Sequence, residues 1–153
     1  ALHQEKKGNE PYDISGPVIT TPDGTRQSRI EVKSAASLQD NSPEEITPLP
    51  STRIVFSIRK AIDWEHTELG EQRNNDVYVF CHYTATRKKD NMLDLGFWDF
   101  YVLSTARIEA DPSLAKQKTI SLYRLKKLGI PRVGFGDLYD AILSELKAYY
   151  TLA

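Results

Sequence analysis

The sequence has little of what several protein classes require. It contains one cysteine, Cys81, in 153 residues, so no disulfide can form within the chain. Its three histidines, His3, His66 and His82, are scattered, and a zinc site of Cys and His ligands is not expected. No apolar run approaches the roughly 18 residues that a membrane helix needs, and the first residues lack the apolar core of a secretory signal. We expect a soluble, cytoplasmic protein with no membrane partner.

Neither sign of charge is in large excess. The chain has 20 Lys and Arg against 21 Asp and Glu, a formal net charge of −1. This balance excludes a uniformly basic coat for nucleic acid but allows a local basic patch. Hydrophobic residues make up 40% and charged residues 27%, an ordinary globular composition that excludes wholesale disorder. The length favours a single domain over residues 1–153.

Four segments have the pattern of β-strands or a hairpin. Residues 18–34 combine an extended run, a Pro-Asp-Gly turn and a second strand, which predicts a hairpin. Residues 53–58, 76–84 and 98–105 are rich in β-branched and aromatic residues, which is typical of strands. Both faces of the 76–84 strand are largely apolar. A strand of this kind needs a layer on each side, which favours an α/β or α+β fold over an open antiparallel sheet.

Helical patterns are concentrated near the C-terminal end. Residues 122–128 predict a short helix that ends at Gly129. Residues 136–150 predict a second helix that packs an apolar stripe on the sheet. The stripe consists of Leu138, Ile142, Leu146 and Tyr149. Residues 40–51 hold three of the eight prolines and have no regular period, so we expect an irregular, mobile loop there.

The predicted hairpin carries the residues with the clearest chemical potential. Strand alternation places Glu31 and Lys33 on one face, roughly 6 to 7 Å apart. Ile30 and Val32 fall on the opposite, buried face. Asp13 stands at the entrance to the hairpin, where folding the chain back brings its carboxylate next to Glu31. Two carboxylates without histidine or thiolate suit a hard cation such as Mg²⁺, which keeps water molecules and binds substrate phosphate.

Lys33 completes a pattern suited to phosphodiester hydrolysis. A metal ion at the carboxylates would screen the scissile phosphate and lower the pKa of a bound water molecule. Lys33 would orient or help to deprotonate that water, or stabilise the developing negative charge. The spacing does not distinguish between these roles, and a solvated charge pair on an edge strand is the alternative interpretation.

Asp13, then Glu31-Val32-Lys33 on a strand, then small residues and Gln39, resemble the PD-(D/E)XK nuclease superfamily of restriction-endonuclease-like phosphodiesterases. A wider set of segments is similar to a group of bacterial proteins assigned to that superfamily. These segments are RIEVKSAASLQ, VFSI, DVYVFCHYTA, FWDFYVLST and QKTISL. The resemblance extends over about residues 12–150.

The resemblance implies a central mixed β-sheet flanked by helices, Mg²⁺ or Mn²⁺ as cofactor, and DNA as substrate, in restriction, defence or repair. It implies that Asp13, Glu31 and the backbone carbonyl of Val32 are metal ligands. Lys33 is then the catalytic lysine, and Gln39 is a polar residue near the phosphate.

The chain departs from the family pattern at its start. Tyr12 stands where a proline often precedes the first aspartate. The family fold usually opens with a helix that supplies a further acidic residue, and we expect this chain to lack that first helix. Glu5 and Glu10 are the nearest acidic candidates, and neither has a convincing helical context.

A basic cluster and two buried-looking polar residues complete the candidates. Five cations lie within twelve residues that contain no acid: Lys116, Lys118, Arg124, Lys126 and Lys127. They form either a binding surface for nucleic-acid phosphates, with steep salt dependence, or a solvated helix face. We interpret His82 as a hydrogen-bonded structural histidine and Cys81 as a small core residue.

Three functions follow from these patterns. The first is a Mg²⁺-dependent nuclease that cleaves DNA, with a homodimer for cutting both strands left open. The second is a module of the same fold that binds nucleic acid without cutting it. The third is a scaffold domain that uses the 40–51 loop.

Overall fold

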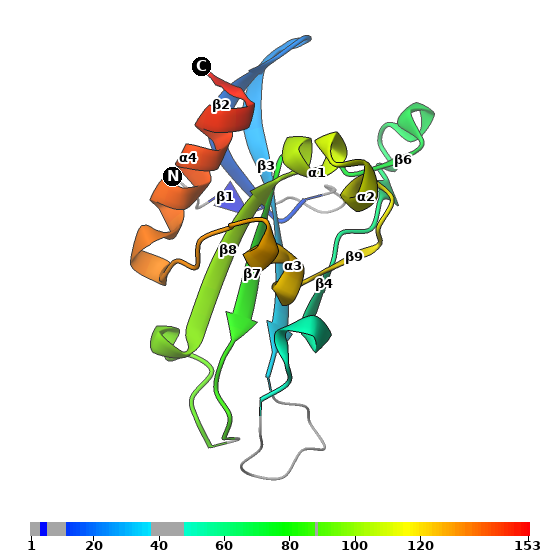
Figure 1. The fold of residues 1–153 in the computed structure, drawn as a ribbon. Helices are drawn as coiled ribbons and strands as arrows, with labels where there is room; N and C mark the ends of the chain where they lie inside the picture. Colours follow the sequence, from blue (N-terminus) through cyan, green and yellow to red (C-terminus); the bar gives the residue numbers. More distant parts are fainter. Residues whose placement is uncertain (1–3, 6–11, 38–47, 88) are drawn as a thin grey trace.

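The computed structural model describes residues 4–5, 12–37, 48–87 and 89–153. They form a mixed α+β fold around one twisted sheet (Figure 1). Its main path is β1 (Gln4–Glu5), β2 (Ile14–Thr21), β3 (Gly24–Ala36), β7 (Val77–Tyr83) and β8 (Trp98–Ser104), and β10 (Thr151–Leu152) also pairs with β2. Strands β3 and β7 are parallel and the other pairs are antiparallel, so the sheet is mixed.

The predicted hairpin is confirmed and is longer than expected. The hydroxyl of Thr21 donates to the carbonyl of Gly24 across the turn at 3.0 Å. Gly24 has φ of +123°, a conformation that residues with a Cβ rarely adopt. The two strands differ in length. The first residue of β2, Ile14, pairs with Ile30, and no residue of β2 pairs with β3 beyond that point. Residues 31–36 of β3 therefore extend beyond β2 and, among the described strands, pair with β7 alone.

The connection from β3 to β7 covers one face of the sheet. It contains η1 (Ser51–Arg53), β4 (Val55–Ser57), β5 (Ala61–Ile62), η2 (Thr67–Leu69) and β6 (Glu71–Gln72). Strand β4 pairs with β9 (Thr119–Ser121), and β5 pairs with β6. Phe56 of this layer packs on Phe80 of β7 with ring centroids 4.9 Å apart. Three short helices complete the layer: α1 (Thr105–Ala110), α2 (Pro112–Ala115) and α3 (Leu122–Lys127).

Helix α4 (Leu138–Tyr149) covers the opposite face of the sheet (Figure 1). Two further short 3-10 helices precede it in the chain: η3 (Leu95–Phe97) lies directly before β8, and η4 (Phe135–Asp137) lies directly before α4. Ile142 and Leu146 are buried against β7 and β8, which confirms most of the predicted stripe. Tyr149 was wrongly included, because it is 43% exposed. The helix ends at Tyr149, and the extended backbone of Tyr150 turns that side chain toward the sheet instead.

The other expected elements agree with the structure in part. Strands over 76–84 and 98–105 are confirmed as β7 and β8, while the 53–58 strand is regular only at Val55–Ser57. The 122–128 helix is confirmed as α3 and is followed by Gly129 with φ of +77°. Of the 40–51 loop, residues 40–47 lie outside the described residues, 48–50 are irregular, and Ser51 begins η1. In the described part of the chain, no helix has the length and apolarity to cross a bilayer.

Asp76 fixes the start of the parallel β3–β7 ladder. Its carboxylate accepts hydrogen bonds from both terminal nitrogens of Arg26, at 2.7 and 2.8 Å, and from the backbone N–H of Arg29, at 2.8 Å. Its own N–H donates to the carbonyl of Arg29 at 2.8 Å. Its carbonyl accepts the N–H of Thr105 at 2.8 Å and the hydroxyl of Tyr150 at 3.0 Å. One residue, 6% exposed, thus joins β3, β7, α1 and the end of α4.

We predict that Asp76→Ala lowers the free energy of unfolding by about 3 kcal/mol, because it leaves the guanidinium of Arg26 and the part-buried N–H of Arg29 without their partner. Urea denaturation measures the change. Glu68→Ala is the control: this carboxylate is exposed on η2 and forms no ion pair with the described residues, so the expected change is within about 0.5 kcal/mol. Equal effects of the two substitutions would contradict the role of Asp76.

Candidate active site

Asp13 closes the hairpin at the point where β2 begins. Its backbone N–H donates to the carbonyl of Ile30 at 3.0 Å. Its carboxylate oxygen Oδ2 accepts the N–H of Val32 at 2.9 Å. The Asp13 side chain therefore binds the N–H of Val32, where a backbone carbonyl would accept if β2 continued. This hydrogen bond holds the carboxylate beside the part of β3 that lies beyond β2.

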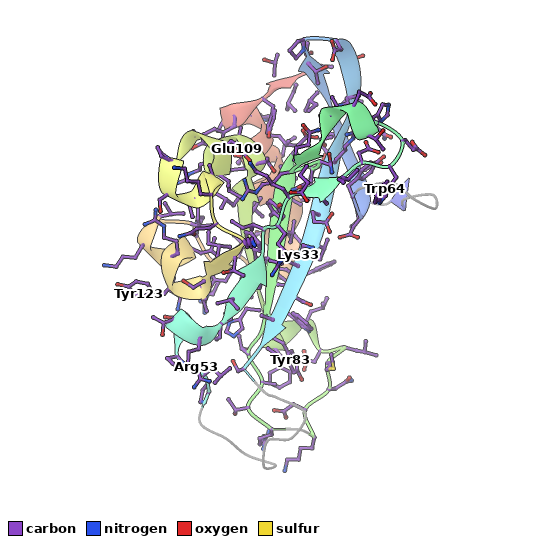
Figure 2. The ribbon with its side chains drawn as sticks, turned by 90° about the vertical axis from the view of Figure 1, so that its right-hand side faces the viewer. Lys33, Arg53, Trp64, Tyr83, Glu109 and Tyr123 are labelled. Atoms are coloured by element: carbon purple, nitrogen blue, oxygen red, sulfur yellow. The ribbon has the colours of Figure 1, made fainter. Side chains whose placement is uncertain are left out.

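Glu31 and Lys33 lie on one face of β3, as the alternation predicts. The register pairs Glu31 with Tyr78 and Lys33 with Phe80 of β7. Lys33 Nζ is 3.3 Å from Glu31 Oε1, and the side chains are 33% and 19% exposed. Figure 2 shows Lys33 near the middle of the side that carries the β3–β7 connection. On the opposite face Ile30 is buried as expected, whereas Val32 is 36% exposed, contrary to the prediction.

The surroundings of Glu31 disfavour a negative charge on its carboxylate. Burial raises the pKa of Glu31 above its usual value, and the negative charge of Asp13 raises it further. The ammonium of Lys33 opposes this shift without cancelling it. A second positive charge between Asp13 and Glu31 would therefore relieve repulsion that Lys33 alone does not remove.

The donor set fits Mg²⁺ or Mn²⁺. Carboxylate oxygens come from Asp13 and Glu31, and the carbonyl of Val32 lies on the same edge of β3 as the N–H that binds Asp13. Mg²⁺ is commonly held by one or two carboxylates while it retains several water molecules. Within the described ranges, no group of three or more His, Cys, Asp or Glu side chains is placed to hold a metal ion.

The structure separates the predicted basic cluster. Lys116 and Lys118 are exposed between α2 and β9. Arg124 bonds to Asp111 at 3.1 Å, and Lys127 Nζ lies 5.4 Å from the ring centroid of Tyr123. Lys126 lines a surface hollow together with His82, Asp99 and Arg132, and neither Lys116 nor Lys118 lines it. Gln39, the remaining predicted site residue, lies outside the described residues.

The sequence pattern does not identify two buried residues near the candidate active site, Tyr78 and Arg73. Tyr78, beside Glu31, has its pKa raised to about 12, chiefly by burial, and the charge of Arg73 opposes that shift. The side chain of Arg73 is 1% exposed, pairs with Glu109, and donates to the carbonyls of Ile58 and Gln117 at 2.8 and 2.9 Å. Arg73 falls in a polar stretch without period, where a buried arginine cannot be distinguished from an exposed one.

His82 and Cys81 have structural roles, as predicted. His82 Nε2 is 3.0 Å from the hydroxyl oxygen of Ser37, and both residues are buried. Burial lowers the pKa of His82, which favours the neutral ring. Burial raises the pKa of the Cys81 thiol to about 11, which disfavours a reactive thiolate.

Comparison with known proteins adds no further constraint: no protein-family model, curated protein or solved structure matches the chain. The case for a function therefore depends on the geometry around Asp13, Glu31 and Lys33.

We predict that, without divalent metal, the stability difference between Glu31→Gln and wild type shifts in favour of the variant as the pH rises from about 4 to 7. The folded state holds the Glu31 proton more tightly than the unfolded state, because the folded pKa is raised. The contribution of Glu31 to wild-type stability therefore falls as the pH rises from the ordinary carboxyl pKa through the raised one, and glutamine removes this loss. Urea denaturation across this pH range in EDTA measures it.

The matched control is Glu68→Gln, which removes an exposed charge outside the site. A difference that instead moves toward wild type with rising pH would show that Lys33 overcompensates the repulsion.

Proposed function

We propose that this chain is a metal-dependent nuclease of restriction-endonuclease-like fold that hydrolyses phosphodiester bonds in DNA. The observation that carries the proposal is the convergence of Asp13, Glu31 and Lys33 at the end of the β2–β3 hairpin. Strand alternation alone brings Glu31 next to Lys33, but it does not bring Asp13, eighteen positions before Glu31, to the same place. The mixed sheet with parallel β3 and β7 is consistent with the proposed fold.

The mechanism assigns a separate task to each residue. Asp13, Glu31 and the carbonyl of Val32 would hold Mg²⁺ or Mn²⁺, which supplies charge screening at the phosphate and a more acidic water molecule. The hydrogen bond from Val32 fixes the Asp13 carboxylate before substrate arrives. Lys33, tethered beside Glu31, places a positive charge where the attacked phosphate gains negative charge. Gln39 is proposed to contact the phosphate.

The nucleic-acid contacts belong to the same proposal. Exposed Lys116 and Lys118 have the freedom to neutralise backbone phosphates, and Lys126 and Lys127 extend the positive charge along α3. Arg124 has a weaker claim, because its guanidinium already binds Asp111.

A second candidate is a module of the same fold that binds nucleic acid without cutting it. The ion pair between Lys33 and Glu31 favours this alternative, because the ammonium at 3.3 Å already gives Glu31 a counter-ion in the absence of metal. The two candidates differ in whether loss of Glu31 matters: it abolishes cleavage in the first and leaves binding intact in the second.

We predict that Lys33→Ala and Asp13→Asn each reduce Mg²⁺- or Mn²⁺-dependent cleavage of end-labelled DNA by at least about 100-fold, the scale for removing one stabilising group. Product formation on denaturing gels measures the rate. Lys147→Ala is the control, because it removes an exposed lysine from α4, on the opposite side of the sheet.

Undiminished cleavage by folded Lys33→Ala protein would remove Lys33 from the mechanism. Salt-sensitive DNA binding by a wild-type protein that does not cleave, unchanged in Glu31→Gln, would identify the chain as the non-cutting module.

A further inference from the structure

A basic hollow of about 300 Å³ lies between the β5–β6 pair and the turn from α2 to β9. Its lining includes four exposed cations, Arg59, Lys60, Lys116 and Lys118, from two segments that are far apart in the sequence. The sequence pattern indicated only the second pair. The fold adds Arg59 and Lys60, which follow β4 and precede β5.

The charge of the basic hollow is not compensated within the described part of the chain. None of its four exposed cations lies within ion-pair distance of a described carboxylate, and Glu71 is the single acid that lines the hollow. By contrast, Arg87 and Arg124 elsewhere on the surface are paired with Asp90 and Asp111. Four cations around one acid repel one another, and a bound anion would relieve that repulsion.

Buried Arg73 fixes the walls of the basic hollow. It donates to the carbonyl of Ile58, directly before Arg59, at 2.8 Å. It also donates to the carbonyls of Ala115 and Gln117, on both sides of Lys116, at 3.2 and 2.9 Å. The N–H of Ile58 further donates to the carbonyl of Lys118 at 3.0 Å. One buried guanidinium therefore holds the backbone of both cation-bearing segments in place, so the positions from which the four cations extend are fixed before an anion binds.

The basic hollow and the candidate active site lie on the same side of the sheet. Tyr78 is the cross-strand neighbour of Glu31, and the charge of Arg73 acts on its hydroxyl. Figure 2 faces this side and shows Lys33 and Glu109, the ion-pair partner of Arg73, on it. Tyr78 and Arg73 are themselves buried, so they connect the two places through the interior of this layer.

We propose that the basic hollow binds a phosphate group of a nucleic-acid strand and anchors it away from the candidate active site. Its place along a cleaved strand rests on the proposed function, whereas phosphate binding does not. The phosphate is either an internal diester, with one negative charge, or a terminal monoester, with nearly two. Both present oxygen acceptors to Arg59, Lys60, Lys116 and Lys118.

The test is fluorescence anisotropy of a labelled single-stranded oligonucleotide, with and without a 5′-phosphate, in EDTA so that no cleavage occurs. Lys60→Gln/Lys118→Gln should weaken binding and reduce the slope of log affinity against log salt by about 1.4, or about 0.7 for each lost contact. Arg53→Gln/Lys147→Gln removes two exposed cations elsewhere and should leave the slope near that of wild type. All four positions are exposed, so thermal unfolding should be unchanged.

Weakening for both oligonucleotides supports an internal diester, and weakening confined to the 5′-phosphorylated one supports a terminal monoester. Equal binding by the hollow variant and wild type, or no binding by wild type, overturns the inference whatever the cleavage assay shows. Hollow-dependent binding by a protein that never cleaves would retain the phosphate site and refute the nuclease.

Discussion

The parallel pairing of β3 with β7, anchored at Asp76, is the constraint on which the rest of the structure depends. Asp76 binds β3 through Arg26 and Arg29 before β7 begins, and so sets the register that places Glu31 beside Tyr78. The same residue accepts hydrogen bonds from α1 and from Tyr150. A slip of one residue in this register would turn Glu31 and Lys33 to the α4 side of the sheet.

The candidate active site arises because β3 is longer than its hairpin partner. Beyond Ile30 the edge of β3 loses β2, and Asp13 supplies a carboxylate where a backbone partner would continue the sheet. The same arrangement brings that carboxylate close enough to raise the pKa of half-buried Glu31. The strain is electrostatic, and it is of the kind that a divalent cation or a proton relieves.

The parts predicted from the sequence are those with a strong local pattern. β7 is apolar on both faces, the hairpin has a Pro-Asp-Gly turn, and alternation is enough to pair Glu31 with Lys33. Helices α1 and α2 are six and four residues long and depend on caps from Ser104 and Asp111, so no periodic signal forms. Burial of Asp76 and Arg73, the exposure of Val32 and the joining of Arg59 and Lys60 to Lys116 arise from tertiary contacts, which local patterns do not contain.

The most direct test of the central claim, that Asp13 and Glu31 form one cation site, is a calorimetric titration with Mn²⁺. Wild type should give a saturable binding heat that Asp13→Asn and Glu31→Gln both abolish, while Glu68→Gln retains it. Affinity should also increase as the pH rises through the raised pKa of Glu31, because the metal competes with its proton. Identical titrations of wild type and both site variants would contradict the account.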